Sequence, residues 1–259
     1  MTVFAVLGLG EAGLRYATDL LAAGAAVSGF DPAWPAGRPP PAGLRLAGSA
    51  AGAASGAAVV LSLTGAGAAE PAARDAAAGL TEGTVFADLN TTSPEAKRRV
   101  AAVLDGTGAL FADVAVLAPV PRAGLRTPLV LAGPGREELA RLLGPLGVPV
   151  ADAGPQTGAA AGRKLLRSVF MKGLAAVVLE SLEIAEQAGL TGWVRDQITA
   201  ELTAADEQLV TRLVDGTKQH AARRLAEMRA TDEYAAALGV SDPVVRATIA
   251  RLETLAGQR

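Results

Sequence analysis

The first thirteen residues place the strongest constraint on the fold. An apolar run of strand length, residues 3–7, meets the pattern Gly-x-Gly-x-x-Gly at Gly8, Gly10 and Gly13, and a helical apolar pattern follows at once. In this context the first glycine permits a tight turn, the second lets the backbone approach a pyrophosphate, and the third allows close helix–strand packing. The helix that begins here directs free N–H groups at a bound phosphate. The sequence therefore predicts a dinucleotide site.

A second predicted strand, residues 26–30, supports this interpretation because it ends in Asp31, 18 residues past Gly13. An acid about 20 residues after the glycines typically bonds the adenosine ribose hydroxyls. Arg38, in the proline-rich loop that follows, could pair with a 2′-phosphate, whereas Asp31 would repel one. We therefore predict NAD or NADP, with NAD slightly favoured. The predicted cofactor-binding residues are Gly8, Leu9, Gly10, Glu11, Ala12, Gly13, Asp31, Leu63, Thr64 and Asn90.

Strand and helix patterns alternate through the first 150 residues. Further apolar runs of strand length lie at 57–63, 84–89, 110–117, 128–132 and 148–151. This alternation predicts a parallel, doubly wound sheet, in which ligands bind beyond the carboxyl ends of the strands. Thr64 and Asn90 follow two such ends, which makes them candidates for the nicotinamide side of the site; ordinary polar caps and turns are the alternative.

The pattern changes after a break at 154–158. Residues 159–187 contain no proline and two glycines, and their apolar spacing predicts one helix of about 45 Å, at about 1.5 Å per residue. We expect an α/β chain in which a doubly wound Rossmann domain, residues 1–157, precedes an all-α domain, residues 158–259. The long helix joins the two domains.

Composition excludes several kinds of protein. The chain has no cysteine, which excludes disulfides, thiolate metal sites and cysteine nucleophiles and fits a cytoplasmic protein. Its one histidine, His220, cannot form a histidine-cluster metal site, and we predict no metal. A net charge of −2 with both signs interspersed gives no case for nucleic acid or an anionic membrane. We found no apolar run of membrane-spanning length.

Cations gather at the start of the long helix. Lys164, Ser168 and Met171 share one helical stripe, and Arg167 and Lys172 flank it. Interconverting an alcohol and a ketone requires a group that exchanges the hydroxyl proton, and burial beside like charges would lower the pKa of a lysine toward that role. The alternative is a solvated basic face.

The order of these motifs resembles the β-hydroxyacid dehydrogenases, which include 6-phosphogluconate and 3-hydroxyisobutyrate dehydrogenases. The resemblance rests on the glycine pattern, Asp31, the stretch Asp-Leu-Asn-Thr-Thr-Ser-Pro at 88–94, the strand with Asp113 and the lysine that opens the long helix. It implies that Lys164 is the general acid/base and that Ser168 stands where the family has an asparagine. The closer likeness is to a bacterial phosphogluconate-dehydrogenase-like branch.

The resemblance also marks a substrate loop and a second constellation. The family's Ser-Gly-Gly loop is replaced after Asp113 by an apolar stretch, and an arginine-rich helical stripe at 220–231 could clamp an anion or be an ordinary surface. In the family, a partner's C-terminal helices complete the site, so we expect a homodimer. The predicted substrate-binding residues are Val116, Leu117, Ala118, Arg167, Lys172, His220, Arg223 and Arg224.

Three functions remain open from the sequence. The first is an NAD(P)-dependent oxidoreductase that acts on a small acidic hydroxy or keto compound, with Lys164 and Ser168 as the catalytic residues. The second is an imine reductase, against which Lys164 counts because the related enzymes generally do not use a lysine there. The third is a sensor or scaffold that binds the cofactor without turnover.

Overall fold

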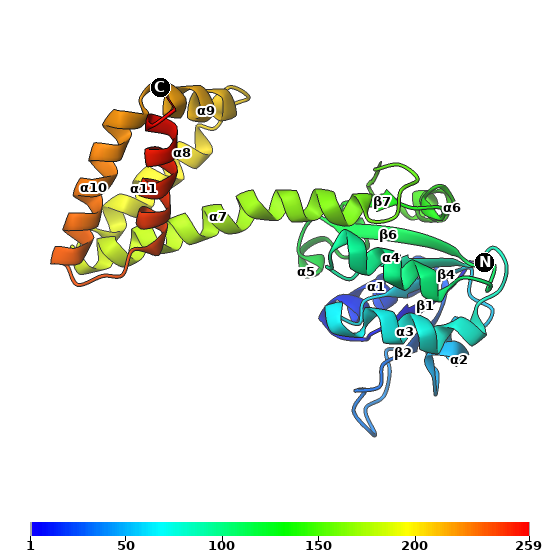
Figure 1. The fold of residues 1–259 in the computed structure, drawn as a ribbon. Helices are drawn as coiled ribbons and strands as arrows, with labels where there is room; N and C mark the ends of the chain where they lie inside the picture. Colours follow the sequence, from blue (N-terminus) through cyan, green and yellow to red (C-terminus); the bar gives the residue numbers. More distant parts are fainter. Residues whose placement is uncertain (1, 259) are drawn as a thin grey trace. The chain divides into compact units, whose positions relative to one another are not determined.

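The computed structural model describes residues 2–258 and divides the chain into two compact units, one through Arg167 and one from Ser168 (Figure 1). The first unit is a Rossmann-type α/β domain and the second is entirely helical, which confirms the predicted fold class. The sequence placed the division at 157/158, before the helix α7 (Ala159–Gln187). The structure assigns the first residues of α7 to the first unit.

The first unit is built on one eight-stranded sheet in the order β3-β2-β1-β4-β5-β6-β7-β8. Most of its strands read as unbroken apolar runs because helices cover both faces. The strands are β1 (Val3–Leu7), β2 (Ala26–Phe30), β3 (Leu44–Leu46), β4 (Val59–Ser62), β5 (Val85–Asp88), β6 (Leu110–Val116), β7 (Leu129–Ala132) and β8 (Val150–Asp152).

The sheet is parallel, as the sequence predicted, at every pairing of the described strands but one, because β7 runs antiparallel to β6. The link between them, residues 117–128, contains only the four-residue helix α5 (Val120–Ala123) and a 3-10 turn (Gly124–Arg126). A parallel return requires a crossover, usually a helix that packs across the sheet, and this link contains no helix longer than four residues. The reversal lies beyond β6, away from the glycine loop.

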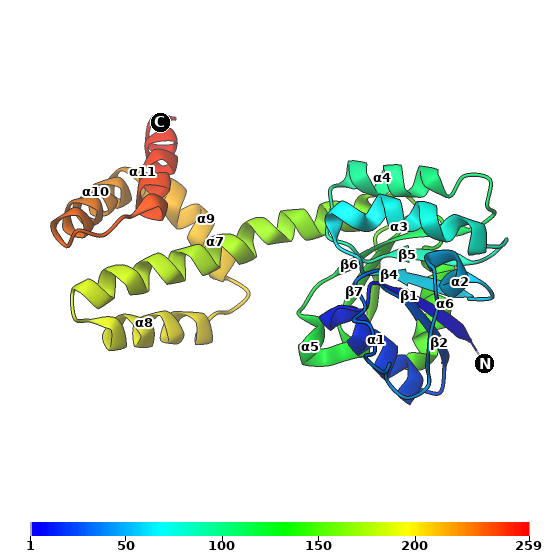
Figure 2. The ribbon, with the colours of Figure 1, turned by 90° about the horizontal axis from the view of Figure 1, so that it is seen from below.

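Helices cover both faces of the sheet (Figure 2). One face packs against α1 (Glu11–Ala22) and α6 (Arg136–Leu143), and the other against α2 (Ala50–Ala54), α3 (Ala69–Ala76) and α4 (Pro94–Val103). Alanine makes up much of the α2 and α3 contact surface, so these helices can approach the strands closely. Further 3-10 turns span Ala66–Ala68, Ala77–Gly79 and Gly144–Leu146.

The helix α4 begins with two residues that favour a helix start, Ser93 and Pro94. Ser93 is its N-cap, and the Ser93 hydroxyl accepts a hydrogen bond from the Ala96 N–H at 3.2 Å. Pro94 occupies the first helical position, where its missing N–H costs nothing. This start places Lys97 on the inner face of α4.

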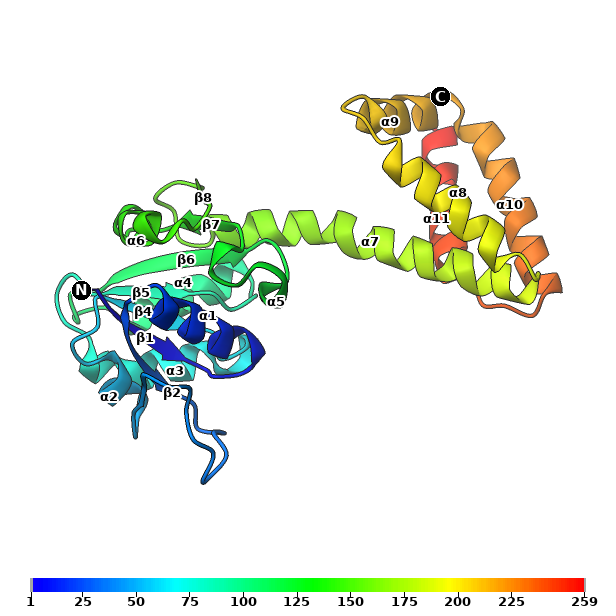
Figure 3. The same ribbon diagram turned by 180° about the vertical axis from the view of Figure 1, so that it is seen from behind.

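The second unit contains α7 from Ser168 onward and, within the described residues, four further helices, α8 (Thr191–Thr203), α9 (Leu209–Gln219), α10 (Ala221–Ala237) and α11 (Pro243–Ala256) (Figure 3). The buried Glu180 carboxylate on α7 accepts hydrogen bonds from the N–H groups of Val244 and Val245, both at 2.8 Å, and so holds the start of α11. Across residues 2–258, we find no helix with the length and apolar character that a membrane crossing requires.

Candidate cofactor-binding and active site

The three glycines after β1 have different surroundings. Gly8 has a positive φ of +87°, and a Cβ there would lie 2.6 Å from the Leu63 carbonyl oxygen. A Cβ on Gly13 would lie 1.8 Å from the carbonyl oxygen of Gly8. A Cβ on Gly10 would meet no described atom within 4 Å. The chain itself therefore requires the first and third glycines, whereas the second leaves open space.

That open space belongs to a cavity of about 460 Å³ at the carboxyl ends of the central strands. Five of the residues predicted to contact a cofactor line it: Gly8, Gly10, Asp31, Leu63 and Thr64. The Thr64 hydroxyl is buried and has no hydrogen-bond partner among the described residues. A cavity with an unpartnered hydroxyl beside a bare glycine backbone fits a dinucleotide.

Asp31 connects the end of β2 to the glycine loop. Its Oδ2 accepts a hydrogen bond from the Leu9 N–H at 2.7 Å, and its Oδ1 accepts one from the Ala33 N–H at 2.8 Å. Each carboxylate oxygen keeps acceptor capacity for a further donor. Asp31 therefore shapes the loop and still presents a charge to the cavity.

The other predicted cofactor residues lie beside the cavity rather than on its wall. The Leu9 side chain is buried in the core, and only its N–H takes part in the loop. Glu11, Ala12 and Gly13 form the first turn of α1, which no side chain within residues 2–258 caps.

The cavity wall also includes Pro32 and Ala33, at the start of the proline-rich loop after Asp31. The sequence analysis missed one further part of the wall, one face of α3 and the turn before it, at Ala68, Pro71, Ala72 and Asp75. The helical spacing of these small residues was a signal, because positions i, i+3, i+4 and i+7 share a face.

Arg38 and Trp34 contact each other in the proline-rich loop. The Arg38 guanidinium carbon lies 4.8 Å from the centre of the Trp34 ring, and the indole N–H donates to the Arg38 carbonyl oxygen at 3.0 Å. Arg38 therefore stacks on an aromatic ring and is not among the residues that line the cavity.

Asn90 uses its side chain to tie two strand ends together. Its Nδ2 donates to Asp88 Oδ1 at 2.6 Å and to Ser62 Oγ at 3.1 Å, and its Oδ1 accepts from the Gly65 N–H at 2.7 Å. Asn90 thus fixes the loop that carries Thr64. Its contact with a cofactor stays a prediction.

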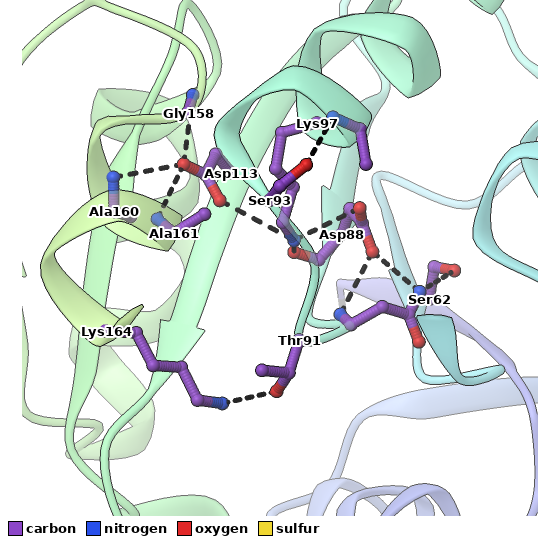
Figure 4. A network of polar contacts seen from close by, with 12 residues as sticks. Ser62, Asp88, Thr91, Ser93, Lys97, Asp113, Gly158, Ala160, Ala161 and Lys164 are labelled. Carbon is purple, nitrogen blue, oxygen red and sulfur yellow. Dashed lines mark hydrogen bonds and ion pairs between the residues drawn. The ribbon is translucent and has the colours of Figure 1, made fainter. Parts of the chain in front are cut away.

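Lys164 and Thr91 meet at the edge of this site, as Figure 4 shows. The half-buried Lys164 lies in the second turn of α7, and its Nζ donates to the Thr91 hydroxyl at 2.7 Å. Of the cations near Lys164 in the sequence, Arg163 donates to the Asp152 carbonyl oxygen at 3.1 Å and Arg167 is exposed. Thr91 was not among the predicted site residues.

Asp88, Lys97 and Asp113 form a buried ionic cluster in the same domain as Lys164. Lys97 Nζ is 3.1 Å from Asp88 Oδ2 and 3.5 Å from Asp113 Oδ1, and all three residues have an exposed fraction of 0%. The sequence analysis did not single out Lys97. The signal was a repeated tripeptide, Phe-Ala-Asp at 86–88 and 111–113, which places a carboxylate at the same register of two neighbouring strands.

The predicted substrate loop follows β6. Val116, Leu117 and Ala118 are half-buried, and the Leu117 N–H donates to the Pro128 carbonyl oxygen at 3.0 Å. The chain then enters α5, so an apolar surface takes the place of the family's Ser-Gly-Gly loop.

The remaining predicted residues belong to the second unit. Ser168 and Lys172 lie further along α7. His220 separates α9 from α10, so it does not continue the helical stripe of Arg224. The Arg223 guanidinium pairs with Glu227 at 2.8 Å, and that of Arg224 donates to the Thr217 hydroxyl at 2.7 Å. Each of the two arginines thus has a partner on its own unit.

Two family models match the chain. Residues 3–150 match the NAD binding domain of 6-phosphogluconate dehydrogenase, and residues 185–255 match a domain of unknown function, DUF1932. The fold and the site define an NAD(P)-binding protein of the dehydrogenase type. The chain belongs to the 6-phosphogluconate dehydrogenase NAD-binding family, within the β-hydroxyacid dehydrogenase superfamily.

Individual relatives agree with this assignment. A conserved hypothetical protein from Sinorhizobium meliloti 1021 is 31% identical, with a TM-score of 0.63 over 99% of this chain and 88% of that one. The conserved protein MTH1747, of unknown function and described as similar to 3-hydroxyacid dehydrogenases, is 26% identical, with a TM-score of 0.61 over 98% and 96%. A reductive aminase from Aspergillus terreus in complex with NADPH is 19% identical and shares the fold, with a TM-score of 0.84 over 100% and 94%.

Among curated proteins, an uncharacterized 28.5 kDa protein of Methanothermus fervidus is 26% identical over 150 residues. These residues are 58% of this chain and 57% of that protein, so the similarity spans little more than half of either.

Proposed function

We propose that this protein is an NAD(P)-dependent oxidoreductase that moves a hydride between the nicotinamide and a carbon of a small acidic hydroxy or keto compound. The observation that carries the proposal is the placement of Lys164. Its Nζ contacts Thr91, and the neighbouring Asn90 holds Gly65 in the loop that lines the cofactor cavity. An ammonium group is therefore fixed beside the loop that carries Thr64.

In this proposal Lys164 exchanges the proton of the substrate hydroxyl. The nicotinamide, when bound, supplies or accepts the hydride. A free lysine has a pKa of about 10.4, which is too high for efficient proton transfer at neutral pH, so the role requires the site to favour the neutral amine. Thr91 holds the amine in place.

The cavity favours NAD over NADP in this proposal. The charged side chains on its wall are the carboxylates Asp31 and Asp75, and no arginine or lysine of the described chain lines it. A 2′-phosphate beside these carboxylates would be repelled. The Aspergillus terreus reductive aminase nevertheless binds NADPH, so both cofactors must be measured.

The second unit supplies the substrate's anion site and the dimer surface in this proposal. Arg224 would bind an acidic group, with His220 and Arg223 beside it, and a partner subunit would contribute them. Large apolar side chains of this unit are exposed, among them Leu179 at 61%, Trp193 at 63% and Val210 at 69%. A second copy of the chain would cover such a surface.

A second candidate function is imine reduction, because the reductive aminase has the highest structural similarity quoted above. The two reactions need the same hydride donor and differ in the acceptor bond, C=O or C=N. Lys164 favours the alcohol–ketone reaction. A protein that binds the cofactor without turnover is the third candidate.

The test is a turnover screen of hydroxy acids, keto acids and cyclic imines with NAD(H) and NADP(H) in separate assays. Lys164→Ala should retain NADH binding and lower turnover by about 10²–10⁴-fold. Lys218→Ala, the same change at an exposed position on α9, serves as the control and should retain turnover. A substrate that Lys164→Ala converts at the wild-type rate would contradict the assigned role. Turnover of imines alone would favour the second candidate, and measurable NADH binding with no turnover the third.

A further inference from the structure

Two buried carboxylates lie side by side in the sheet. Asp88 at the end of β5 and Asp113 in β6 occupy the same register, and both have an exposed fraction of 0%. Neighbouring strands lie about 4.8 Å apart, so two carboxylates at this register repel each other unless a cation neutralises them. Lys97 from α4 supplies it, at 3.1 Å from Asp88 Oδ2 and 3.5 Å from Asp113 Oδ1.

The Asp113 carboxylate holds the start of α7. Its Oδ2 accepts hydrogen bonds from the N–H groups of Gly158, Ala160 and Ala161, at 3.1, 3.0 and 3.1 Å. These are free N–H groups of a helix N-terminus, which favours a negative charge. Lys164 lies three residues after Ala161, within one helical turn of this attachment.

The Asp88 carboxylate holds the loop that carries Thr91, the hydrogen-bond partner of Lys164. Its Oδ1 accepts from the N–H and the Nδ2 of Asn90, at 3.0 and 2.6 Å, and the next residue is Thr91. Lys97 Nζ also donates to the Asp88 carbonyl oxygen at 2.6 Å. The helix that carries Lys164 and the loop that carries Thr91 therefore meet at one ammonium group (Figure 4).

We infer that Lys97 is the positioning residue of the active site: it joins the start of α7 to the loop after β5 and so sets the contact between Lys164 and Thr91. The contacts form a closed ring, from Lys97 through Asp113 and the α7 start to Lys164, and back through Thr91, Asn90 and Asp88. Removal of the ammonium opens this ring and leaves two buried carboxylates in repulsion. The inference rests on the proposed function only in taking Lys164 as the acid/base.

The chain offers a direct measurement because it has four lysines, at 97, 164, 172 and 218. Lysine labelled with ¹³C at Cε gives few NMR signals, and Lys164→Arg identifies that of Lys164. Thr91→Val shows where this signal lies once the Lys164–Thr91 hydrogen bond is lost. In Lys97→Met, we expect the Lys164 signal to leave its wild-type position and move to the Thr91→Val position.

Val100→Ala is the matched control, because Val100 lies one turn further along α4, has an exposed fraction of 1% and belongs to a cluster of buried apolar residues. It should lower the denaturant midpoint and leave the Lys164 signal unchanged. A wild-type signal in Lys97→Met, or an equal shift in both variants, would overturn the inference. If Lys97→Met does not fold, the double variant Asp88→Asn/Lys97→Met removes the repulsion between the two carboxylates. The Lys164 signal of the double variant should still move, and an unmoved signal in that variant also overturns the inference.

The NMR signal is measured without substrate, so its outcome is separate from that of the proposed function. An unmoved signal counts against the positioning role of Lys97 alone. Wild-type turnover in Lys164→Ala counts against the proposed function and leaves the geometry of the ring untouched.

Discussion

The helices α1 and α7 both begin within the first unit, and their first N–H groups have different partners. Within the described chain, no side chain caps α1, and the cavity wall includes Gly8 and Gly10 just before it. The start of α7 is closed by Asp113, which accepts three backbone N–H groups. The first N–H groups of α1 are therefore available to an anionic group of a ligand, whereas those of α7 are bonded to the Asp113 carboxylate.

The difference separates binding from positioning. A helix that keeps its N-terminus open must be held by the face that it buries, which for α1 includes Tyr16, Ala17 and Leu20. A helix whose start is attached to the sheet can carry a side chain at a fixed distance from that attachment. We therefore expect changes at the two helix starts to affect different measured quantities.

The largest expected effect is that of Gly13→Ala. The new Cβ would lie 1.8 Å from the Gly8 carbonyl oxygen, so α1 must move away from β1. We expect the free energy of unfolding to fall by more than about 3 kcal/mol, the size of a severe steric change, with loss of NADH binding. Denaturant unfolding followed by calorimetric titration measures both, and a wild-type midpoint would show that this contact is not as tight as described.

Asp113→Asn should affect stability and spare cofactor binding. The amide retains an acceptor for the α7 N–H groups and leaves Lys97 with one carboxylate instead of two. Disruption of a buried ion pair costs about 3–5 kcal/mol, and the retained polar group should reduce this toward about 2 kcal/mol. The NADH dissociation constant should stay close to that of the wild type, because Asp113 does not line the cavity. A large loss of NADH affinity with an unchanged free energy of unfolding would contradict the assignment of Asp113 to positioning rather than to cofactor binding.

Gly10→Ala should give the opposite result. Its Cβ would meet no described atom within 4 Å, and its backbone is extended, so the fold tolerates the methyl group. We expect the unfolding midpoint to be retained and the NADH dissociation constant to rise about 10–100-fold, which corresponds to about 1.4–2.8 kcal/mol. Equal NADH affinity in the two proteins would place the pyrophosphate elsewhere.

The smallest expected effect concerns the buried face of α1. The Tyr16 hydroxyl is buried with no hydrogen-bond partner in residues 2–258, and burial, with Asp19 nearby, raises the pKa of Tyr16 to about 12 from 10.0. Tyr16→Phe removes the unpartnered hydroxyl, so the free energy of unfolding at pH 8 should rise by about 1 kcal/mol.

The pH dependence of stability provides a separate test of Tyr16. The pKa of Tyr16 is higher in the folded state than in the unfolded state, so ionisation of Tyr16 does not change the free energy of unfolding below pH 10. Between pH 10 and about 12 it lowers the free energy of unfolding of the wild type by about 1.4 kcal/mol per pH unit. The variant should lack that loss when unfolding midpoints are measured across this range. Identical slopes for the two proteins would mean that Tyr16 titrates normally.

The sequence predicted the parts of the fold that depend on local spacing. The long helix 159–187 and the strands 3–7 and 26–30 lie where the residue pattern placed them. Two short elements, β3 and α2, were missed because three to five residues carry too little periodicity. The direction of β7 depends on the connection after β6, which lacks a crossover helix, rather than on the strand's own residues.

The candidate site divides in the same way. The glycines and Asp31 form a motif with fixed spacing, so the sequence located that part of the cavity. Asp88 and Asp113 are 25 residues apart in the sequence and become neighbours only through strand pairing. From the sequence alone, Lys97 looks like an ordinary surface lysine on an amphipathic helix. Its role becomes visible only when the strand pairing brings both carboxylates beside it.

The positions of the two tryptophans make each of them a separate fluorescent reporter. The chain contains two tryptophans, Trp34 in the first unit and Trp193 in the second. Trp34 lies one residue beyond Ala33, which lines the cavity, and Trp193 is largely exposed on α8. Replacement of either tryptophan by phenylalanine leaves a single tryptophan in the chain. Fluorescence from Trp34 can then report cofactor binding, and fluorescence from Trp193 can report the association of two copies of the chain.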